Sequence, residues 1–387
     1  MNGHLVEPRG LQKDAWGIVL ELGNDANGKR KQKWSTFHGT KTQARAELRR
    51  LLHDAERGVP IESPNQTLGV FLATWLATYA KNSVTPKTYE RYEDHILRHI
   101  VPALGHVPLS KLTPMQVENF YAARRSGGRL DGRAGGLSER TLLHMHSVLN
   151  LALKCGVRWQ VLARNPMEGV TRPKATSTEM KCLSSQDASH LLELAKTTPH
   201  YTLLCVALGT GMRRGEILAL RWSDFDLDTK AVFVRRSLEQ TRGGSLRFKE
   251  PKTRRGKRRV DLPASLVGIL RRHKATQARQ RLLLGSEYHD DDLVFSKASG
   301  SPIPPDNITG FFRVFAANSG HQGLRFHDLR HAHATILLQQ NVAAKVVSER
   351  LGHSSIAITL DTYSHVLPTM QDDAACRLDD ALWNAAG

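Results

Sequence analysis

Two proline-containing stretches divide the chain and limit what it can fold into. One is Pro60-Ile-Glu-Ser-Pro-Asn65, and the other runs from Asn165-Pro166 to Arg172-Pro-Lys174. Proline lacks a backbone N–H and fixes φ, so regular structure rarely continues through such stretches. A chain of 387 residues is long enough for two or three domains with separate cores. We therefore expect a multidomain protein.

The first segment, residues 1–60, has the pattern of a small β-sheet plus one helix. Trp16–Leu22 and Trp34–Phe37 read as strands joined through Asn, Asp and Gly, which predicts a hairpin. Thr42–His53 reads as an amphipathic helix with Thr42 as its cap. The segment could be a DNA-binding module or a solvated hairpin with ordinary surface charge.

The second segment, residues 67–170, is helical almost throughout by its pattern. The Thr-Pro pairs at 85–86 and 113–114 look like helix starts, because proline suits the first turn. The expected helices are Leu68–Tyr79, Pro86–His99, Thr113–Arg124 and Ser138–Cys155. The basic residues around them fit either a helical clamp for duplex DNA or a bundle with basic faces.

The third segment, residues 178–370, mixes helices with a short sheet, and a tail follows at 371–387. Its expected strands are Ala231–Arg236, Leu246–Phe248 and Arg258–Leu262. The tail carries a weak helical stripe of Leu378, Leu382 and Trp383. We expect an α+β domain followed by a short helix.

The charge balance points to a polyanionic partner. The chain has 55 Lys and Arg against 37 Asp and Glu, an excess that suits nucleic acid or an anionic membrane surface. The membrane alternative is weaker, since no apolar run approaches the ~20 residues that span a bilayer. The four cysteines lie far apart without a CxxC pair, which favours an intracellular protein without a disulfide framework or a Cys-type zinc site.

Arg213 lies where one helix gives way to another. The apolar helix Tyr201–Leu208 is expected to end at Gly209-Thr-Gly211, and a new helix to run over Met212–Leu220. An arginine beside the free N–H groups of a helix start favours an anion. The alternative is a helix cap with surface arginines; a nucleotide-binding G-x-G-x-x-G loop fails because position 214 is Arg.

The stretch Arg242–Arg259 is densely basic, with Glu250 as its single acid. Its order of strand, Glu-Pro-Lys252-Thr-Arg-Arg-Gly-Lys, strand suggests a hairpin whose tip presents Lys252. Such a run is either a phosphate-contacting face or a solvated loop. A lysine at a tip can bring a proton-donating ammonium to a reacting oxygen.

Two histidines, an arginine and a tyrosine complete the candidate site. His327 and Arg330, three residues apart, can share one helix face, and His353 and Tyr363 follow in Leu-Gly-His-Ser-Ser and Asp-Thr-Tyr-Ser-His. His327 and His331 could instead bind zinc at i and i+4, or be structural histidines. A single tyrosine near a chain end is usually a core or surface aromatic.

Taken in order, these motifs resemble the active site of the tyrosine recombinase (phage integrase) family. Five motifs occur in the family's order and spacing. They are Thr-Gly-Met-Arg-Arg-Gly-Glu, Pro-Lys-Thr, His-Asp-Leu-Arg-His, Leu-Gly-His-Ser-Ser and Asp-Thr-Tyr-Ser-His. The resemblance implies a small N-terminal arm-site-binding domain, an all-α core-binding domain and a mixed α+β catalytic domain. It implies six catalytic residues: Arg213, Lys252, His327, Arg330, His353 and Tyr363.

The resemblance also implies their roles. Tyr363 is the nucleophile that forms a 3′-phosphotyrosine, and His327 is the candidate base. Arg213, Arg330 and His353 neutralise the phosphate, while Lys252 protonates the departing 5′ oxygen. Glu216 and His331 are expected to support the arginines. No cofactor, metal or ATP is required.

The partners implied are double-stranded DNA attachment sites, a homotetramer on DNA, and accessory DNA-bending or directionality proteins, in the bacterial cytoplasm or nucleoid. An integrase of a phage or integrative element is favoured over a two-domain chromosome-dimer resolvase because of the extra N-terminal segment. A type IB topoisomerase, a non-catalytic DNA-binding regulator and a zinc hydrolase are the alternatives.

Overall fold

The computed structural model describes residues 2–7, 15–24, 30–56, 66–175, 183–251, 254–363 and 370–383. The chain divides into an N-terminal unit, Met1–Ser177, and a C-terminal unit, Thr178–Gly387. Each is described by itself.

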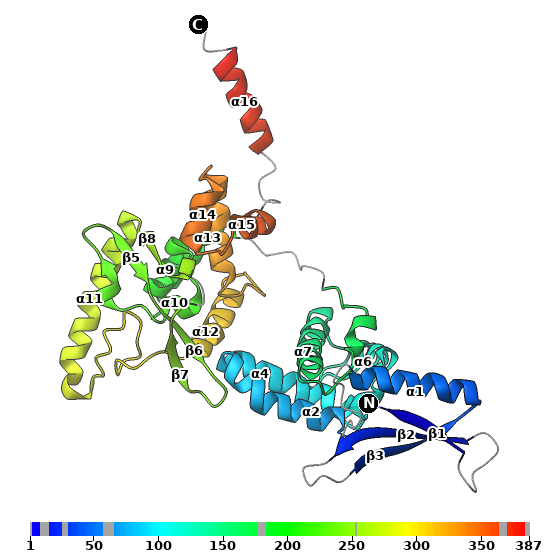
Figure 1. Ribbon diagram of the computed structural model, residues 1–387. Helices are drawn as coiled ribbons and strands as arrows, with labels where there is room; N and C mark the ends of the chain where they lie inside the picture. Colours follow the sequence, from blue (N-terminus) through cyan, green and yellow to red (C-terminus); the bar gives the residue numbers. More distant parts are fainter. Residues whose placement is uncertain are drawn as a thin grey trace. The chain divides into compact units, whose positions relative to one another are not determined.

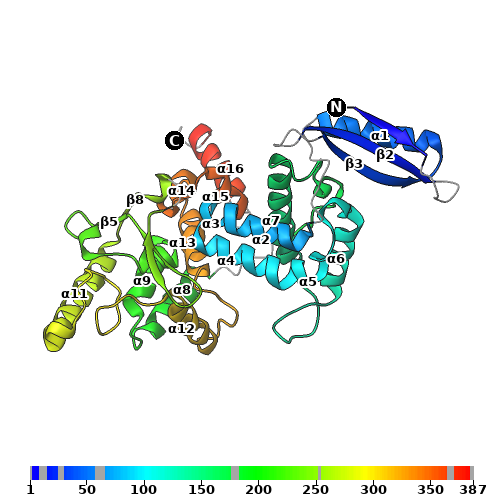
Figure 2. The ribbon, with the colours of Figure 1, turned by 60° about the horizontal axis from the view of Figure 1, so that its bottom comes forward.

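The N-terminal unit begins with a three-stranded antiparallel sheet in the order β1-β2-β3. Its strands are β1 (Gly3–Val6), β2 (Ala15–Asn24) and β3 (Arg30–His38), and α1 (Lys41–Glu56) packs against the sheet (Figure 2). Ile18, Val19 and Leu20 of β2 are each 1% exposed and belong to the core. The predicted strand pair and helix are confirmed. The structure adds β1, a strand of four residues that is too short to be predicted from its sequence pattern.

The cap predicted for α1 is wrong by two residues. Thr42 lies inside the helix, and the side chain of Thr40 accepts a hydrogen bond from the Gln43 amide at 3.4 Å. In turn, the Thr40 backbone amide donates a hydrogen bond to Oε1 of Gln43 at 2.9 Å. This reciprocal arrangement satisfies two N–H groups that a cap at Thr42 would leave unpaired.

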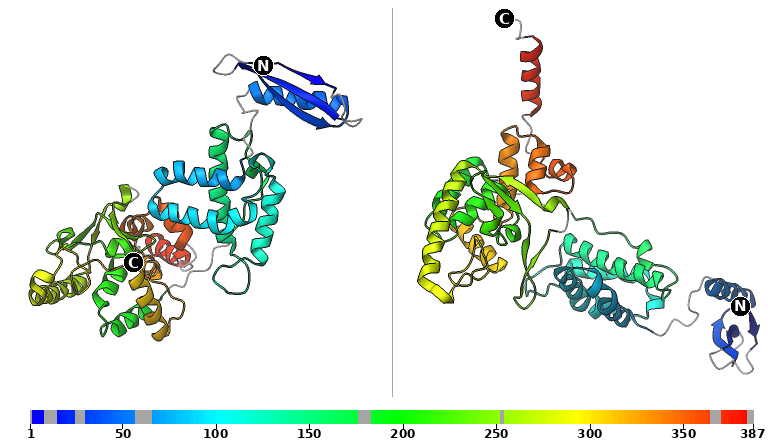
Figure 3. Two further views of the ribbon diagram at one scale, coloured as in Figure 1. Left: turned by 90° about the horizontal axis from the view of Figure 1, so that it is seen from below. Right: turned by 60° about the vertical axis from the view of Figure 1, so that its left-hand side comes forward.

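A helical bundle forms the rest of the N-terminal unit, drawn cyan to green in Figure 3. Thr85 precedes α4 and Thr113 caps α6, each with proline in the first turn, as the sequence predicts. Its core encloses Trp75 and Tyr121, both 0% exposed. The helices are α2 (Leu68–Trp75), α3 (Lys81–Ser83), α4 (Pro86–His95), α5 (Val101–Leu104), α6 (Pro114–Ser126) and α7 (Glu139–Arg158), with π-helical turns over Leu76–Ala80 and Ile96–Ile100.

The C-terminal unit places helices around a small antiparallel sheet of order β4-β5-β8 (Figure 1). The strands are β4 (Phe225–Asp226), β5 (Ala231–Val234) and β8 (Arg258–Asp261). Val232 and Val260 lie opposite each other and face the core. The helices are α8 (Ser185–Ala195), α9 (Tyr201–Thr210), α10 (Arg214–Ile217), α11 (Ala264–Leu284), α12 (Pro305–Asn318), α13 (Asp328–Gln339), α14 (Ala344–Leu351), α15 (Ile356–Tyr363) and α16 (Met370–Leu382).

The hairpin expected between the strands at 246–248 and 258–262 is not formed. Strand β7 (Leu246–Lys249) pairs with β6 (Ser237–Gln240), whereas β8 pairs with β5. Gly243 and Gly244 adopt φ of +84° and +85° in the tight β6–β7 turn, a conformation that glycine adopts without strain. This local turn pairs β7 with β6, and Lys252, the expected tip of the predicted hairpin, lies outside the described residues.

Helices α13, α14 and α15 pack together next to the β4-β5-β8 sheet. A small apolar cluster of Ala334, Leu338, Val347 and Leu351 joins them and encloses Tyr363. Helix α13 also packs on α9, and α14 on β8, so this corner brings together segments that are far apart in sequence. In the part of the chain that the structure describes, no helix is long and apolar enough to cross a membrane.

Candidate active site

Arg213 is fixed by the turn between α9 and α10. Gly211 ends α9 with φ +65°, and Arg213 is the residue that precedes α10. The predicted helix over Met212–Leu220 is shorter, covering Arg214–Ile217. The backbone N–H and the guanidinium of Arg213 both donate to Glu216, at 3.0 and 2.8 Å. The guanidinium is thus held in place while 44% of the side chain stays exposed to receive an anion.

Glu216 is a buried carboxylate between two arginines. It is 3% exposed, and Arg258 from β8 donates at 2.9 Å to the same oxygen that accepts the backbone N–H of Arg213. Burial opposes ionisation, but Arg258 and Arg213 outweigh it and hold the pKa of Glu216 below its usual value. The predicted support of Arg213 by Glu216 matches this geometry. Arg258 was missed, because within the basic stretch nothing distinguishes it from its neighbours.

Arg330 is the more deeply placed of the two predicted arginines. It is 3% exposed and donates to the carbonyls of Gly211 and Leu351, both at 2.7 Å. Burial, followed by the nearby charge of Arg213, lowers the pKa of Arg330 to about 9. Two carbonyls occupy only part of the five N–H donors of a guanidinium, so the remaining donors can bind an anion.

His327 directly precedes α13, and His331 lies one turn into the helix. Their ring centroids are 5.0 Å apart and the rings are perpendicular. Burial, followed by electrostatic coupling to the ring of His331 and the charge of Arg330, lowers the pKa of His327 to about 4. His327 is therefore a neutral imidazole near neutral pH.

Tyr363 ends α15 and is 1% exposed. Its hydroxyl lies 2.7 Å from Nδ1 of His331. The sequence assigned His331 to the support of the arginines, and this contact with the tyrosine was not predicted. The sequence does hold one indication that His331 belongs to the site. It follows His327 by four residues, a spacing that places both rings on one face of the helix.

His353 follows the left-handed Gly352, whose φ of +67° ends α14. Its Nδ1 lies 2.8 Å from the hydroxyl of Thr359, which is 0% exposed and was not singled out from the sequence. Burial, followed by the charges of Arg330 and Arg213, lowers the pKa of His353 to about 4. The ring is therefore neutral and oriented by Thr359.

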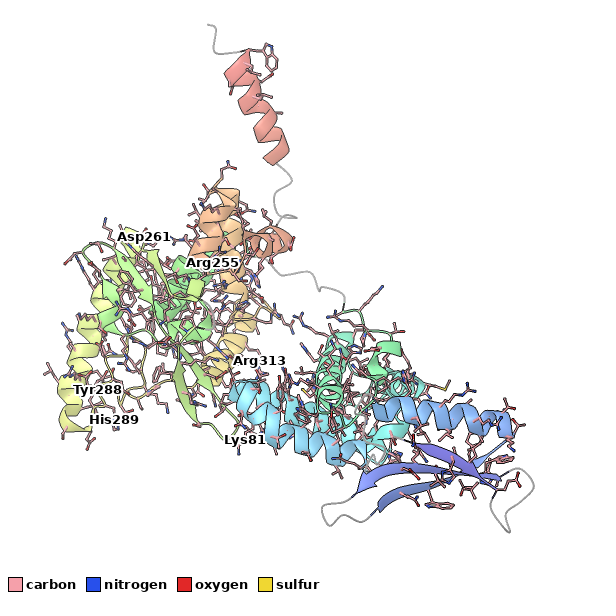
Figure 4. The ribbon with its side chains drawn as sticks, in the orientation of Figure 1. Lys81, Arg255, Asp261, Tyr288, His289 and Arg313 are labelled. Carbon is pink, nitrogen blue, oxygen red and sulfur yellow. The ribbon has the colours of Figure 1, made fainter. Side chains whose placement is uncertain are left out.

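These side chains line one pocket of about 320 Å³. Five of the six predicted residues border it: Arg213, His327, Arg330, His353 and Tyr363, together with His331. The sixth, Lys252, lies outside the described residues. Nearby, Arg255 (labelled in Figure 4) donates to the carbonyl of Ser354 at 2.6 Å, which links the start of β8 to the loop carrying His353.

The pocket has the composition of an anion site with a nucleophile. Two guanidiniums, neutral imidazoles and a phenol can bind a phosphate and attack it. Among the described residues, no group of three or more His, Cys, Asp or Glu side chains is arranged to hold a metal ion. The zinc alternative for His327 and His331 therefore finds no third ligand among them.

Family profiles match both units. The profile of the phage integrase family matches residues 181–370, and that of its N-terminal SAM-like domain matches residues 67–123. A tyrosine recombinase XerC-like protein of Caldanaerobacter subterraneus subsp. tengcongensis is 30% identical, over 95% of this chain and 96% of that protein. An integrase of Streptomyces ambofaciens is 30% identical, over 94% and 92%.

Solved structures share the fold. The Tn1549 transposon integrase in complex with transposon right-end DNA has a TM-score of 0.65 at 20% identity, covering 82% of this chain and 99% of that one. A lambda integrase dimer bound to a COC′ core site has a TM-score of 0.56 at 17% identity, covering 92% and 96%.

Proposed function

The chain belongs to the phage integrase family of tyrosine recombinases, and we propose that its DNA cleavage and rejoining take place in the pocket lined by Arg213, Arg330 and Tyr363. It is a site-specific integrase of a phage or integrative element. The observation that carries the assignment of the pocket is that side chains from four separate sequence motifs meet around one cavity of about 320 Å³.

The two arginines suit the charge of the reaction. Attack on a phosphodiester adds negative charge to the non-bridging oxygens in the transition state, and guanidiniums offer permanent charge and directed N–H donors. Arg213 is held by Glu216, and Arg330 by two carbonyls, so neither must reorganise when DNA binds. The neutral ring of His353 can add a hydrogen bond.

Tyr363 is the proposed nucleophile and Lys252 the proposed acid. The phenol oxygen attacks phosphorus, the bond to the 5′ oxygen breaks, and Lys252 protonates that oxygen; by the family resemblance, His327 is the candidate base for the phenol. The products are a 3′-phosphotyrosine and a free 5′-hydroxyl. Because the ester conserves the energy of the broken bond, a second 5′-hydroxyl can reverse the step without ATP.

The test is trapping the covalent intermediate. A nicked attachment-site duplex loses its short strand after cleavage, so the protein–DNA adduct accumulates and is visible on a denaturing gel. Tyr363→Phe should abolish the adduct while gel-shift affinity for the site stays within about twofold. Tyr288→Phe, a tyrosine beyond the end of α11, is the matched control and should form the adduct normally (Figure 4). An adduct with Tyr363→Phe would refute the assignment.

Lys252 can be tested in the same assay. Lys252→Ala should slow adduct formation about 100-fold or more, as expected for loss of a general acid. A 5′-bridging phosphorothiolate substrate, whose sulfur leaves without protonation, should restore the rate. Lys297→Ala, an exposed lysine of the same unit, serves as control. A slow Lys252→Ala reaction that the phosphorothiolate fails to restore would contradict the role.

We also propose that the protein acts as a homotetramer on paired double-stranded attachment sites, with help from DNA-bending or directionality proteins. Support comes from exposed apolar side chains of α16 and of the residue that follows it: Leu378 is 56% exposed, Leu382 60% and Trp383 67%. Leu382→Asp should lower the yield of paired-site complexes in native gels and leave single-site binding unchanged. Equal yields would argue against this helix as the contact.

The N-terminal sheet is the proposed arm-site-binding module. Trp34 on β3 is 62% exposed, and the sequence of residues 1–60 holds more Lys and Arg than Asp and Glu. Removal of residues 1–60 should weaken assembly on a compound site and spare cleavage of a minimal core site. If the truncated protein assembles like the full chain, the arm-binding role is wrong.

A further inference from the structure

The contact between Tyr363 and His331 joins α15 to α13 at the proposed nucleophile. A buried phenol hydroxyl needs a hydrogen-bond partner, and this one lies 2.7 Å from Nδ1 of His331. The ring centroids are 5.7 Å apart with the planes tilted by 55°. The phenol is therefore in hydrogen-bond range of a titratable nitrogen before any DNA is bound.

Its surroundings favour the neutral form of His331. Burial lowers its pKa, the carboxylate of Asp328 opposes that effect, and the charges of Arg330 and Arg325 add to it. It also contacts the hydroxyl of Tyr363 of α15, and it lines the same pocket as His353. A neutral imidazole carries one proton, so with Nε2 protonated its Nδ1 can accept from the phenol.

His327 occupies a different position. Its ring lies perpendicular to that of His331, at 5.0 Å, and it directly precedes α13. The charges of Arg330 and Arg213 act on it, as expected for a group beside the phosphate-binding arginines. This placement suits a hydrogen bond to the phosphate.

We propose that His331, rather than His327, positions the Tyr363 hydroxyl and accepts its proton during strand cleavage. The inference rests on the proposed role of Tyr363. As the phenol oxygen bonds to phosphorus, its O–H bond breaks and the proton passes to Nδ1 of His331, which becomes an imidazolium. The P–O5′ bond breaks and the 5′ oxygen takes its proton from the general acid. In rejoining, His331 returns its proton to the departing phenolate.

The first experiment compares two variants with the wild type on the nicked substrate. Only variants whose calorimetric unfolding transition matches that of the wild type are included. His331→Asn keeps an acceptor oxygen near the position of Nδ1 but takes up no proton, whereas His331→Ala removes both functions. Loss of a general base predicts cleavage slowed about 100-fold or more in both. His331→Asn should fold like the wild type, which keeps the test informative if His331→Ala does not.

The second experiment separates proton transfer from structural support. Tyr363 is replaced by a ring-fluorinated tyrosine, a more acidic phenol, in the wild-type, His331→Asn and His327→Ala proteins. A phenol that loses its proton more easily depends less on a base, so the fluorinated ring should restore a large part of the rate in His331→Asn. It should give no such recovery in His327→Ala.

The outcomes are distinct. A wild-type rate in His331→Asn, or a slow rate that the fluorinated ring leaves unchanged, overturns the proton-acceptor role of His331. Recovery in His327→Ala alone identifies His327 as the base and also overturns it. Cleavage by Tyr363→Phe would instead refute the proposed function itself, independently of His331.

Discussion

Glu216→Gln tests the electrostatic support of the arginine pocket. The carboxylate is 4% exposed at its side chain and pairs with Arg258, which is 6% exposed, at 2.9 Å. Its second partner, Arg213, is 44% exposed, so solvent screens that pair and it adds little to stability. Removing one partner of a buried ion pair costs about 3–5 kcal/mol.

The amide retains one acceptor oxygen, so we expect the lower end of that range, about 3 kcal/mol. For a unit of this size, each kcal/mol shifts Tm by roughly 2–4 °C, which predicts a decrease of about 6–12 °C. Calorimetry on the full chain measures it. Glu193→Gln, whose carboxylate pairs with Lys196 on the surface, is the matched control and should leave Tm unchanged.

The pH dependence gives a second check on the same variant. The pKa of Glu216 is lowered on folding, so its contribution is complete above the ordinary value of 4.5 and is lost as the pH falls through the folded-state value. The difference in Tm between wild type and Glu216→Gln should therefore be full at pH 7 and shrink below about pH 4.5. A difference that is constant with pH, or as small as for Glu193→Gln, would refute the reasoning.

Two further predictions concern the same unit. Gly211→Ala should lower Tm, because φ is +65° and a Cβ would lie 2.5 Å from the ring of His333; Gly310→Ala, a helical position with open space, should leave Tm the same or raise it. The imidazole NMR signals of His327 and His353 should stay those of neutral rings from pH 8 down to pH 5.5, since both pKa values are lowered to about 4; titration of either ring near pH 6.5 would contradict the burial argument.

Sequence reasoning worked best where structure is local. The Thr-Pro pairs at 85–86 and 113–114 mark the starts of α4 and α6, because proline suits a first helical turn whatever packs around it. It failed where two local alternatives competed. Strand β7 pairs with β6 through the Gly243-Gly244 turn, and nothing in its own residues distinguishes that partner from β8.

The sequence by itself determined the residue types of the site, because a phosphate-transfer pocket needs guanidiniums, imidazoles and a nucleophile, and these stand in recognisable motifs. Only the tertiary structure decided which of them touch. The hydrogen bond between His331 and Tyr363 spans 32 residues, and that between Arg258 and Glu216 spans 42. Such contacts depend on how α13, α15 and β8 pack. A local sequence pattern does not determine the distance between segments that are far apart in the chain, so it could not predict these contacts.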